Sequence, residues 1–274
     1  MLVRSLVALS LLLSSLAFPA RSESADPSGS IVIAGNGPEY RVIEQLVRAF
    51  EKVNSRAYVD VMWDINAKPV ESVKSGQAHI AVTGTPDPNL VPTQIAWDGI
   101  AVLVNLSNST KDVTSQQVAD LFTGKVKQWS ELGGAETRVL VLDRARQTNI
   151  RDTFEQRLGI AGKIPDSSKV IGPDDKAMKT VAGTLPPQSA VTYVSLAPAL
   201  EAVASGVAVR LLPVDKVEPE GPTVKDGRYA LRRPVLLLTR KELNPVVEAF
   251  QAFALSPQGQ KIIDAEYTSF DQKK

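Results

Sequence analysis

The sequence of 274 residues contains no cysteine and only one histidine, His79. Without cysteine the chain has no disulfide, no thiolate nucleophile and no acylated cysteine as a lipid anchor, so its stability must come from an apolar core. One imidazole also cannot build the ligand sets typical of zinc sites. We therefore expect His79 to be structural, and we expect neither a metal ion nor a cofactor.

Motifs of common enzyme classes are missing as well. The sequence has no Walker motif and no G-x-S-x-G motif, and a single histidine leaves little room for a catalytic triad. The only hint of a carboxylate cation site is PDDK (173–176), which lacks the DxDxDG spacing, so a solvated loop is expected. We predict that the protein is not an enzyme. A carboxylate-based hydrolase or transferase is the enzymatic alternative.

Neither sign of charge dominates the chain. Removing residues 1–22 takes Arg4 and Arg21 and no acid from the 31 basic and 30 acidic residues, which brings the net charge to about −1. A balanced chain has no broad positive field to attract nucleic acid or anionic lipid. We expect no nucleic-acid partner, and any site for an anion must be local.

The longest apolar run lies at the N-terminus, from Leu6 to Phe18. Arg4 precedes this run and small residues follow it, which is the pattern of a cleaved secretory signal peptide. The run is shorter than the roughly 20 residues that span a bilayer. We predict a signal peptide over residues 1–22 and an exported, periplasmic protein that does not span the membrane after cleavage.

Aliphatic residues dominate the rest, since 43% of residues are hydrophobic and 5% are aromatic. This composition favours an α/β core. Alternation and buried runs predict strands at 31–34, 57–63, 79–84, 93–106, 138–144, 190–196, 209–215 and 233–240. Helical spacing predicts helices beginning near Pro38, Asn244 and Ser256 and others at 68–76, 114–122, 150–158 and 177–183. The segment 216–231 is expected to be a loop.

One junction between a strand and a helix, DRARQTNIRDTFEQRLG (143–159), is dense in arginine. Arg144, Arg146 and Arg151 surround the polar step Thr148–Asn149. The start of a helix offers unpaired N–H groups and a partial positive charge, so added arginines indicate a place for an anion. The alternative for Arg146 and Arg151 is pairing on the surface with acids such as Asp152 and Glu155.

Four segments, in order and with matching spacing, resemble the periplasmic phosphate-binding proteins that serve ABC importers. The segments are AWDGIAVLVN (96–105), LFTGKVKQWSELGG (121–134), RDTFEQRL (151–158) and NPVVEAFQAFALSPQGQKII (244–263). The resemblance implies an α/β, type II periplasmic binding protein fold with two lobes, each a central mixed sheet flanked by helices, joined by two crossover strands. It implies a first lobe of 26–98 plus 232–274 and a second lobe of 99–231, with crossovers around 97–104 and 229–234.

The resemblance also implies where a ligand binds, namely in loops beyond the carboxyl ends of strands. The matching residues are Asn36, Gly37, Asn66, Thr83, Gly84, Thr85, Arg144, Thr148 and Asn149. Arg144 could bind two oxygens of an oxyanion through its planar fork. The family pattern has a hydroxyl near Gly37, an acid near Gly84 and a threonine at Ile150, so this sequence offers fewer polar groups to a ligand.

Two features of the Gly35–Pro38 loop allow a different interpretation. The loop can be a plain structural turn, since a single G-x-G is common. Glu39, in the first helical turn, is expected to compete with an anion for the positive end of that helix.

Trp63 could reach the cleft, whereas Trp129 and Tyr193 are expected to lie in the core.

The resemblance favours an exported, monomeric solute-binding protein that captures phosphate or a related small oxyanion in the interlobe cleft for an ABC importer. The partners would be the oxyanion and an ABC permease. Hinge closure around the ligand would be its mechanism. The substitutions at Gly37, Gly84 and Ile150 favour the alternative, a periplasmic binding-fold protein with an altered or lost anion site that acts in interaction or signalling.

Overall fold

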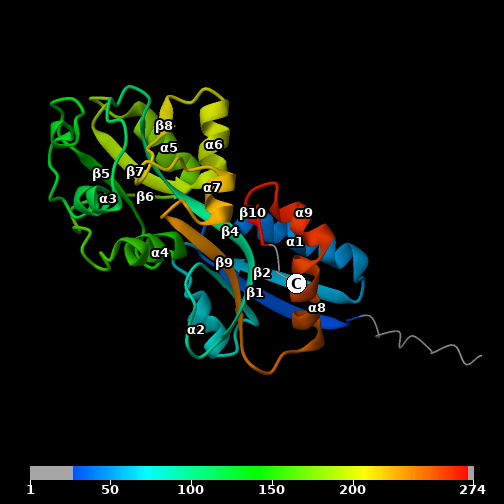
Figure 1. Ribbon diagram of the computed structural model, residues 1–274. Helices are drawn as coiled ribbons and strands as arrows, with labels where there is room; N and C mark the ends of the chain where they lie inside the picture. Colours follow the sequence, from blue (N-terminus) through cyan, green and yellow to red (C-terminus); the bar gives the residue numbers. More distant parts are fainter. Residues whose placement is uncertain (1–26, 271–274) are drawn as a thin grey trace, which may run out of the picture.

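A computed structural model describes residues 27–270 (Figure 1). The predicted signal peptide lies outside these residues. No helix within residues 27–270 is both long enough and apolar enough to cross a membrane.

The described chain alternates strands and helices. The strands are β1 (Gly29–Gly35), β2 (Ala57–Trp63), β3 (Ile80–Thr83), β4 (Val91–Asn105), β5 (Leu140–Arg144), β6 (Lys169–Ile171), β7 (Ala190–Ser195), β8 (Val209–Leu211), β9 (Arg232–Thr239) and β10 (Thr268–Ser269). The helices are α1 (Tyr40–Val53), α2 (Pro69–Lys74), α3 (Ser115–Phe122), the 3-10 helix η1 (Trp129–Leu132), α4 (Asn149–Leu158), α5 (Asp174–Gly183), α6 (Leu196–Ala204), α7 (Gly221–Asp226), α8 (Pro245–Leu255) and α9 (Pro257–Ile263).

The strands are connected in the order β2-β1-β3-β9-β4-β7-β5-β6, with β8 and β10 paired to β4. β1, β2 and β3 are mutually parallel, as are β5, β6 and β7, whereas β4 and β9 run antiparallel to their neighbours. The sheet is therefore mixed, as the sequence predicts.

Alternating side chains of β1 pack into apolar cores on the two faces of the first-lobe sheet. Ile31 and Ile33 belong to a core with α1, α8 and α9, whereas Val32 and Ala34 face α2. Successive strand residues point to opposite faces, so a strand covered on both sides is apolar throughout. Phe50 of α1 meets the ring of Phe250 edge-on at 5.4 Å, which joins two helices of the same layer (Figure 1).

The second lobe has its own core, formed by residues between Ile100 and Leu231. Within it the rings of Phe154 and Tyr193 stack at 3.8 Å, and Phe122 packs edge-on against Phe154 at 4.8 Å. Trp129 is fully buried and donates from its ring nitrogen to the carbonyl of Ser189. Trp129 and Tyr193 are thus core residues, as predicted.

β4 and β9 connect the two cores. The first half of β4 pairs with β9, where Trp97 lies opposite Pro234 and Gly99 opposite Arg232, and the second half pairs with β7 and β8. This arrangement confirms the predicted fold of two α/β lobes joined by two crossover strands (Figure 1). The exact lobe bounds, 26–98 plus 232–274 and 99–231, remain a prediction.

Several elements are absent from the sequence prediction, among them the short strands β6 and β10 and the 3-10 helix η1. The expected loop 216–231 contains the helix α7, and α6 follows β7 directly. α7 has only six residues and depends on a capping box between Glu220 and Thr223, so it is too short for helical periodicity to reveal it. α6 was missed because no turn residue separates it from the preceding strand.

Candidate functional site

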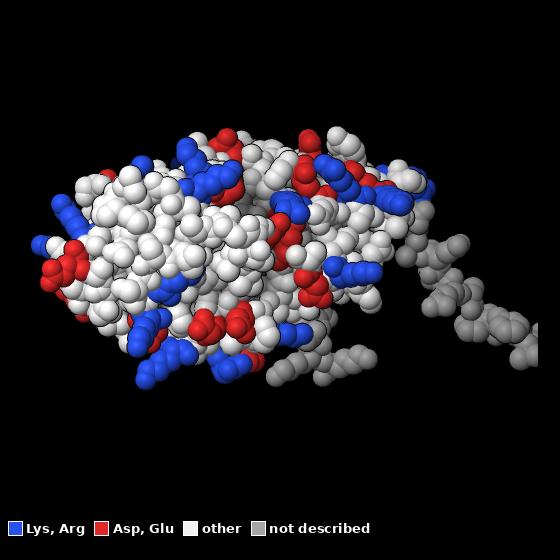
Figure 2. Space-filling model, turned by 90° about the horizontal axis from the view of Figure 1, so that it is seen from above, with Lys and Arg blue, Asp and Glu red and all other residues white. Residues whose placement is uncertain are grey.

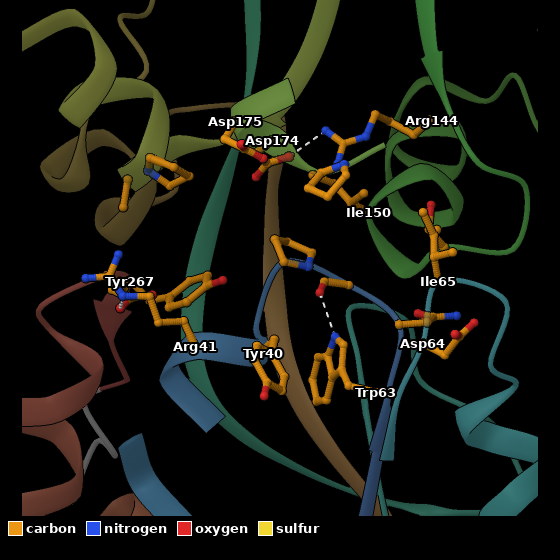
Figure 3. A pocket seen from close by; sticks show the side chains of 18 of the residues that line it. Tyr40, Arg41, Trp63, Asp64, Ile65, Arg144, Ile150, Asp174, Asp175 and Tyr267 are labelled. Carbon is orange, nitrogen blue, oxygen red and sulfur yellow. Dashed lines mark hydrogen bonds and ion pairs between the residues drawn. The ribbon is translucent and has the colours of Figure 1, made fainter. Parts of the chain in front are cut away.

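A cavity of about 980 Å³ lies between the lobes. Tyr40, Arg41 and Trp63 line it from the first lobe, and Arg144 and Asp174 line it from the second. Figure 3 shows Arg144 and Asp174 facing the rings of Tyr40 and Trp63 across the cavity. The Trp63 ring nitrogen donates to the carbonyl of Gly37 at 2.9 Å, which fixes the indole in the wall. Trp63 therefore reaches the cleft, as the sequence suggested.

The structure divides the nine predicted ligand residues into groups. Asn36, Gly37, Arg144 and Thr148 line the large cavity, whereas Asn36, Thr83 and Asn149 line a smaller one of about 320 Å³. Gly84 lies against Thr153 and Arg233, and the Thr85 hydroxyl lies 3.4 Å from that of Thr153. Asn66 is exposed, with its backbone N–H bound to the Asp64 carboxylate.

Arg144 is buried and already paired within the chain. Its Nη1 atom donates to Asp174 Oδ1 at 2.5 Å and to the carbonyl of Tyr193 at 3.3 Å, and 6% of the residue is exposed. Asp174 in turn accepts from the backbone N–H of Ser195. Asp174 belongs to the PDDK segment, which was expected to be a solvated loop. This segment instead begins α5, and Asp174 forms a buried ion pair. Asp174 was missed because nothing local links it to Arg144.

The side chain of Asn36 ties the two lobes together. Its Nδ2 atom donates to the carbonyl of Gln147 at 2.6 Å and to that of Ala67 at 3.0 Å. Its Oδ1 atom accepts from the backbone N–H of Asn149, at 3.2 Å. That N–H is among the groups that the first turn of α4 leaves without a helical partner. A first-lobe amide therefore binds the helix end at which an anion was predicted.

A second buried ion-pair cluster lies where β4, β9 and α4 meet. Arg233 Nη2 is 2.6 Å from Glu39 Oε1 and 2.8 Å from Asp98 Oδ2. Glu39 and Arg233 are both 0% exposed. Glu39 stands at the start of its own helix, but its side chain makes no capping hydrogen bond there and pairs with Arg233 instead.

Asn149 completes this cluster from the second lobe. Its Oδ1 atom accepts from Arg233 Nη1 at 2.8 Å, and its Nδ2 atom donates to Glu39 Oε2 at 2.9 Å. Asp98 accepts a further hydrogen bond from the Ser195 hydroxyl at 2.7 Å. The sequence did offer a signal for Arg233, since a charged residue beginning the apolar strand RPVLLLTR needs a buried partner.

The two glycines of the predicted site make room for the cluster. A Cβ atom on Gly37 would lie within about 2.4 Å of both Glu39 Oε2 and the amide of Asn149. A Cβ atom on Gly84 would lie 2.6 Å from Thr153 Oγ1 and 3.2 Å from Arg233 Nη1. Glycine at these positions thus permits close approach of the lobes. Three predicted residues, Gly37, Gly84 and Asn149, converge on a carboxylate and a guanidinium of the same chain.

Burial and pairing shift the pKa values in this cluster. Burial raises the pKa of the Asp98 carboxyl, and the nearby Arg233 guanidinium opposes that rise. For Arg233, burial alone would lower the pKa, but Glu39 and Asp98 outweigh it and hold the pKa above its ordinary value. Arg233 therefore remains charged, and Asp98 takes up a proton more readily than an exposed aspartate.

Arg151 corrects another prediction. It pairs with Glu155 at 2.8 Å, as expected, but it is buried rather than on the surface and also pairs with Asp143 at 2.9 Å. Asp143 lies in the buried second half of β5, so the guanidinium turns inward to neutralise it. Arg146 is exposed and pairs with Asp166, in line with the surface interpretation.

His79 has a structural role, as predicted. Its Nδ1 atom accepts the backbone N–H of Val32 at 3.0 Å, and burial lowers the pKa of the imidazole. Among residues 27–270, no group of three or more His, Cys, Asp or Glu side chains is arranged to hold a metal ion. On the face seen in Figure 2, basic and acidic side chains are interspersed, in keeping with the balanced charge.

Two α/β lobes around a shared cavity, joined by crossing strands, define a periplasmic-binding-protein-type binding protein. The sequence signature of the PBP superfamily domain matches residues 20–258, and the chain belongs to this superfamily. Curated relatives and a solved structure confirm the predicted kinship with periplasmic phosphate-binding proteins.

Curated relatives carry the name phosphate-binding protein. PstS of Bacillus subtilis is 25% identical over 244 residues, which cover 86% of this chain and 78% of that protein. PstS 2 of Streptococcus agalactiae is 35% identical over 111 residues, and this match spans only 38% of that relative's length. These relatives are named as binding proteins, in agreement with the prediction of a binding protein rather than an enzyme.

One solved structure is similar over nearly the whole described chain. It is described as a phosphate ABC transporter substrate-binding protein from Clostridium perfringens with bound phosphate. Its identity to this chain is 25% and its TM-score is 0.77, with 89% of this chain and 100% of that chain covered. The type II periplasmic binding fold of this chain is thereby confirmed.

Proposed function

We propose that this protein is the solute-binding component of an ABC importer and that its solute is phosphate or a related small oxyanion. Membership of the PBP superfamily supports this proposal, as do relatives that are named phosphate-binding proteins and a similar structure that contains phosphate. The same relatives, together with the predicted signal peptide, support a secreted or periplasmic location and a permease as partner.

The observation that carries the proposal is the composition of one end of the interlobe cavity. The loop after β1 contributes Asn36 and Gly37, the last residue of β5 is Arg144, and the loop after β5 contributes Thr148. Ligands of open α/β sheets bind beyond the carboxyl ends of strands, which is where these residues lie. Both hydrogen bonds of the Arg144 side chain are made by Nη1, and a guanidinium has five N–H donors, so the rest of the fork can bind an oxyanion.

Hinge bending at β4 and β9 would couple binding to closure. A solute that contacts Gly37 in the first lobe and Arg144 in the second has both contacts only when the lobes are closed. Its differential affinity for the closed form would then shift the population toward that form. A permease that binds the closed form would receive only the loaded protein.

Calorimetric titration of residues 23–274 with phosphate, sulfate, arsenate and a phosphonate tests the proposal. We expect saturable binding of at least one oxyanion, and Arg144→Lys should weaken it at least tenfold, about 1.4 kcal/mol, because an ammonium cannot replace the planar fork. Arg146→Lys, at an exposed arginine two residues away, is the matched control and should bind normally. Equal binding by the Arg144→Lys protein would remove Arg144 from the site.

A second candidate function is that of a binding-fold protein that acts in interaction or signalling without capturing an oxyanion. The Arg144–Asp174 and Arg233–Glu39 pairs favour it, because both buried guanidinium groups already have carboxylate partners. The same titration separates the two candidates. The absence of heat from every oxyanion, with a cooperative unfolding transition, would support the second candidate and contradict the first.

A further inference from the structure

The carboxylate of Glu39 is bound the way a protein binds a separate anion. It receives the Arg233 guanidinium at 2.6 Å on one oxygen and the Asn149 side-chain amide at 2.9 Å on the other. These two groups come from β9 and from α4 of the second lobe, whereas Glu39 precedes α1 of the first. The guanidinium supplies charge to one oxygen without a hydrogen bond, and the amide donates a hydrogen bond to the other, so the two groups together form an oxyanion site.

The surroundings of this carboxylate are closely fitted. Glu39 is completely buried, and Gly37 leaves its Oε2 atom a space that any Cβ atom would invade at 2.3 Å. The side chain also makes no hydrogen bond to the end of its own helix, the ordinary role of an acid at that position. Its contacts are therefore made to the lobe junction.

We propose that Glu39 is an internal ligand: its carboxylate occupies an anion site formed by Arg233 and Asn149 at the junction of the lobes. The site accepts a small carboxylate, of the formate class, when the Glu39 side chain is removed. While Glu39 is present, the site is closed to external anions and its contacts hold the two lobes together without a solute.

This proposal is independent of the identity of the transported solute. The Arg144 end of the large cavity and the Glu39 position use different guanidinium groups, with different carboxylate partners, Asp174 and Glu39. An external oxyanion bound near Arg144 therefore does not require displacement of Glu39. The net charge also permits formate to replace the Glu39 side chain. The native cluster has two carboxylates around Arg233, truncation of Glu39 removes one of them, and a bound formate restores that charge.

The experiment is chemical rescue of Glu39→Ala, followed by thermal unfolding in sodium formate and in sodium chloride at equal ionic strength. Truncation to alanine opens a space next to Arg233 and Asn149. We expect formate to raise the melting temperature of Glu39→Ala by about 3 °C more than chloride does, as for a ligand at roughly ten times its Kd. Propionate, with its larger apolar part, should have a smaller effect than formate.

Three matched proteins receive the same treatment. The wild type keeps its own carboxylate, Glu39→Gln fills the space with an amide, and Glu44→Ala removes a different carboxylate of α1 whose partner is Arg48. None of these should show a formate-specific shift. A shift of equal size in Glu39→Gln or Glu44→Ala, or no shift in Glu39→Ala, would overturn the proposal.

If Glu39→Ala does not accumulate in folded form, its refolding yield from urea becomes the readout. A yield that is higher in formate than in chloride supports the internal ligand, and equal yields contradict it. Titration of the wild type with phosphate runs in parallel and reports on the proposed function alone. Binding of phosphate without formate rescue would refute only the internal ligand, and rescue without any oxyanion binding would refute only the transport of an oxyanion.

Discussion

Glu39 and Arg233, far apart in the sequence, meet in an ion pair of 2.6 Å with neither residue exposed to solvent. Their pairing brings the loop after β1 against β9, and Asn149 extends the contact to α4 of the second lobe. The ion pairs of the cluster lie within the first lobe, so the hydrogen bonds that Asn149 and Ser195 contribute from the second lobe are the part that favours the closed arrangement of the lobes.

Loss of the Arg233 guanidinium should therefore destabilise the folded protein strongly. Arg233→Gln leaves Glu39 and Asp98 as two buried carboxylates with no cation between them, and we expect the free energy of unfolding to fall by about 3–5 kcal/mol. Arg232→Gln, at the neighbouring position, removes a half-buried arginine that lies over the Trp97 ring at 4.0 Å and should cost about 1 kcal/mol. Urea denaturation of both proteins measures the difference. Similar losses would mean that the cluster contributes no more than an ordinary surface contact.

The raised pKa of Asp98 predicts that the stability of the folded protein depends on pH. Because burial raises this pKa above 3.8 in the folded protein, the folded state keeps the proton to a higher pH than the unfolded state does. The resulting stabilisation is complete below the unfolded pKa of about 3.9 and is lost as the pH rises through the folded pKa. The stability of the wild type relative to Asp98→Asn should thus fall as the pH increases from about 4 to 7.

Asp226 provides a control of opposite sign. A hydrogen bond from the backbone of Arg228 lowers the pKa of this exposed carboxyl, so its contribution is present above the unfolded pKa and lost as the pH falls. The stability difference between wild type and Asp226→Asn should therefore shrink toward low pH. Urea unfolding at several pH values from about 2 to 7 gives both slopes, that of Asp98 above about pH 4 and that of Asp226 below it. A flat or rising difference for Asp98→Asn would contradict the protonation of Asp98 on folding.

Much of the fold could be predicted because its signals are local. β1 and β3 are short apolar runs, α1 has Ile43, Leu46 and Phe50 on one face, and the four family-like segments fix their order. α7 could not be predicted, since six residues without a repeating apolar face carry no periodic signal.

The contacts of the candidate site residues could not be predicted from the sequence. Gly37, Arg144 and Asn149 were assigned from the family resemblance; they lie at the lobe junction, and their role in binding a ligand stays a prediction. Their partners Asp174 and Arg233 come from distant segments, and no short-range pattern links an arginine to the acid that neutralises it. Arg151 shows the same limit, because its helix position suggested the surface while Asp143 holds it in the interior.

Gly84 should be intolerant of any side chain. In Gly84→Ala the new Cβ atom would lie 2.6 Å from Thr153 Oγ1, so the lobes must separate or Thr153 must move. We expect a loss of about 1–3 kcal/mol in the free energy of unfolding and a larger radius of gyration in X-ray scattering. Gly183→Ala is the control, because a Cβ atom there meets nothing within 4 Å. Unchanged scattering and stability in Gly84→Ala would show that the lobes are not closed in solution as they are here.

Asp174 should weaken oxyanion binding by competing for Arg144. Asp174→Asn removes the charge that holds Arg144 Nη1 at 2.5 Å, so the guanidinium gains freedom to bind a solute in the cavity. An amide also accepts less strongly than a carboxylate, and hydrogen bonds to charged groups are about twice as strong as neutral ones. We expect the affinity for phosphate to rise roughly tenfold, equivalent to about 1.4 kcal/mol.

Asp175 supplies the matched comparison for that change. Its carboxylate also lines the cavity, but it is exposed and its partner is Lys179 rather than Arg144. Asp175→Asn alters the charge of the cavity by the same amount, so it should raise the affinity only by the general electrostatic effect, which is small for an exposed group. Calorimetric titration with phosphate at low and at physiological salt separates the two effects, because salt screens the exposed charge more than the buried pair. If both variants gain equally and both gains vanish with salt, Asp174 acts through the field of the cavity and not through its ion pair with Arg144.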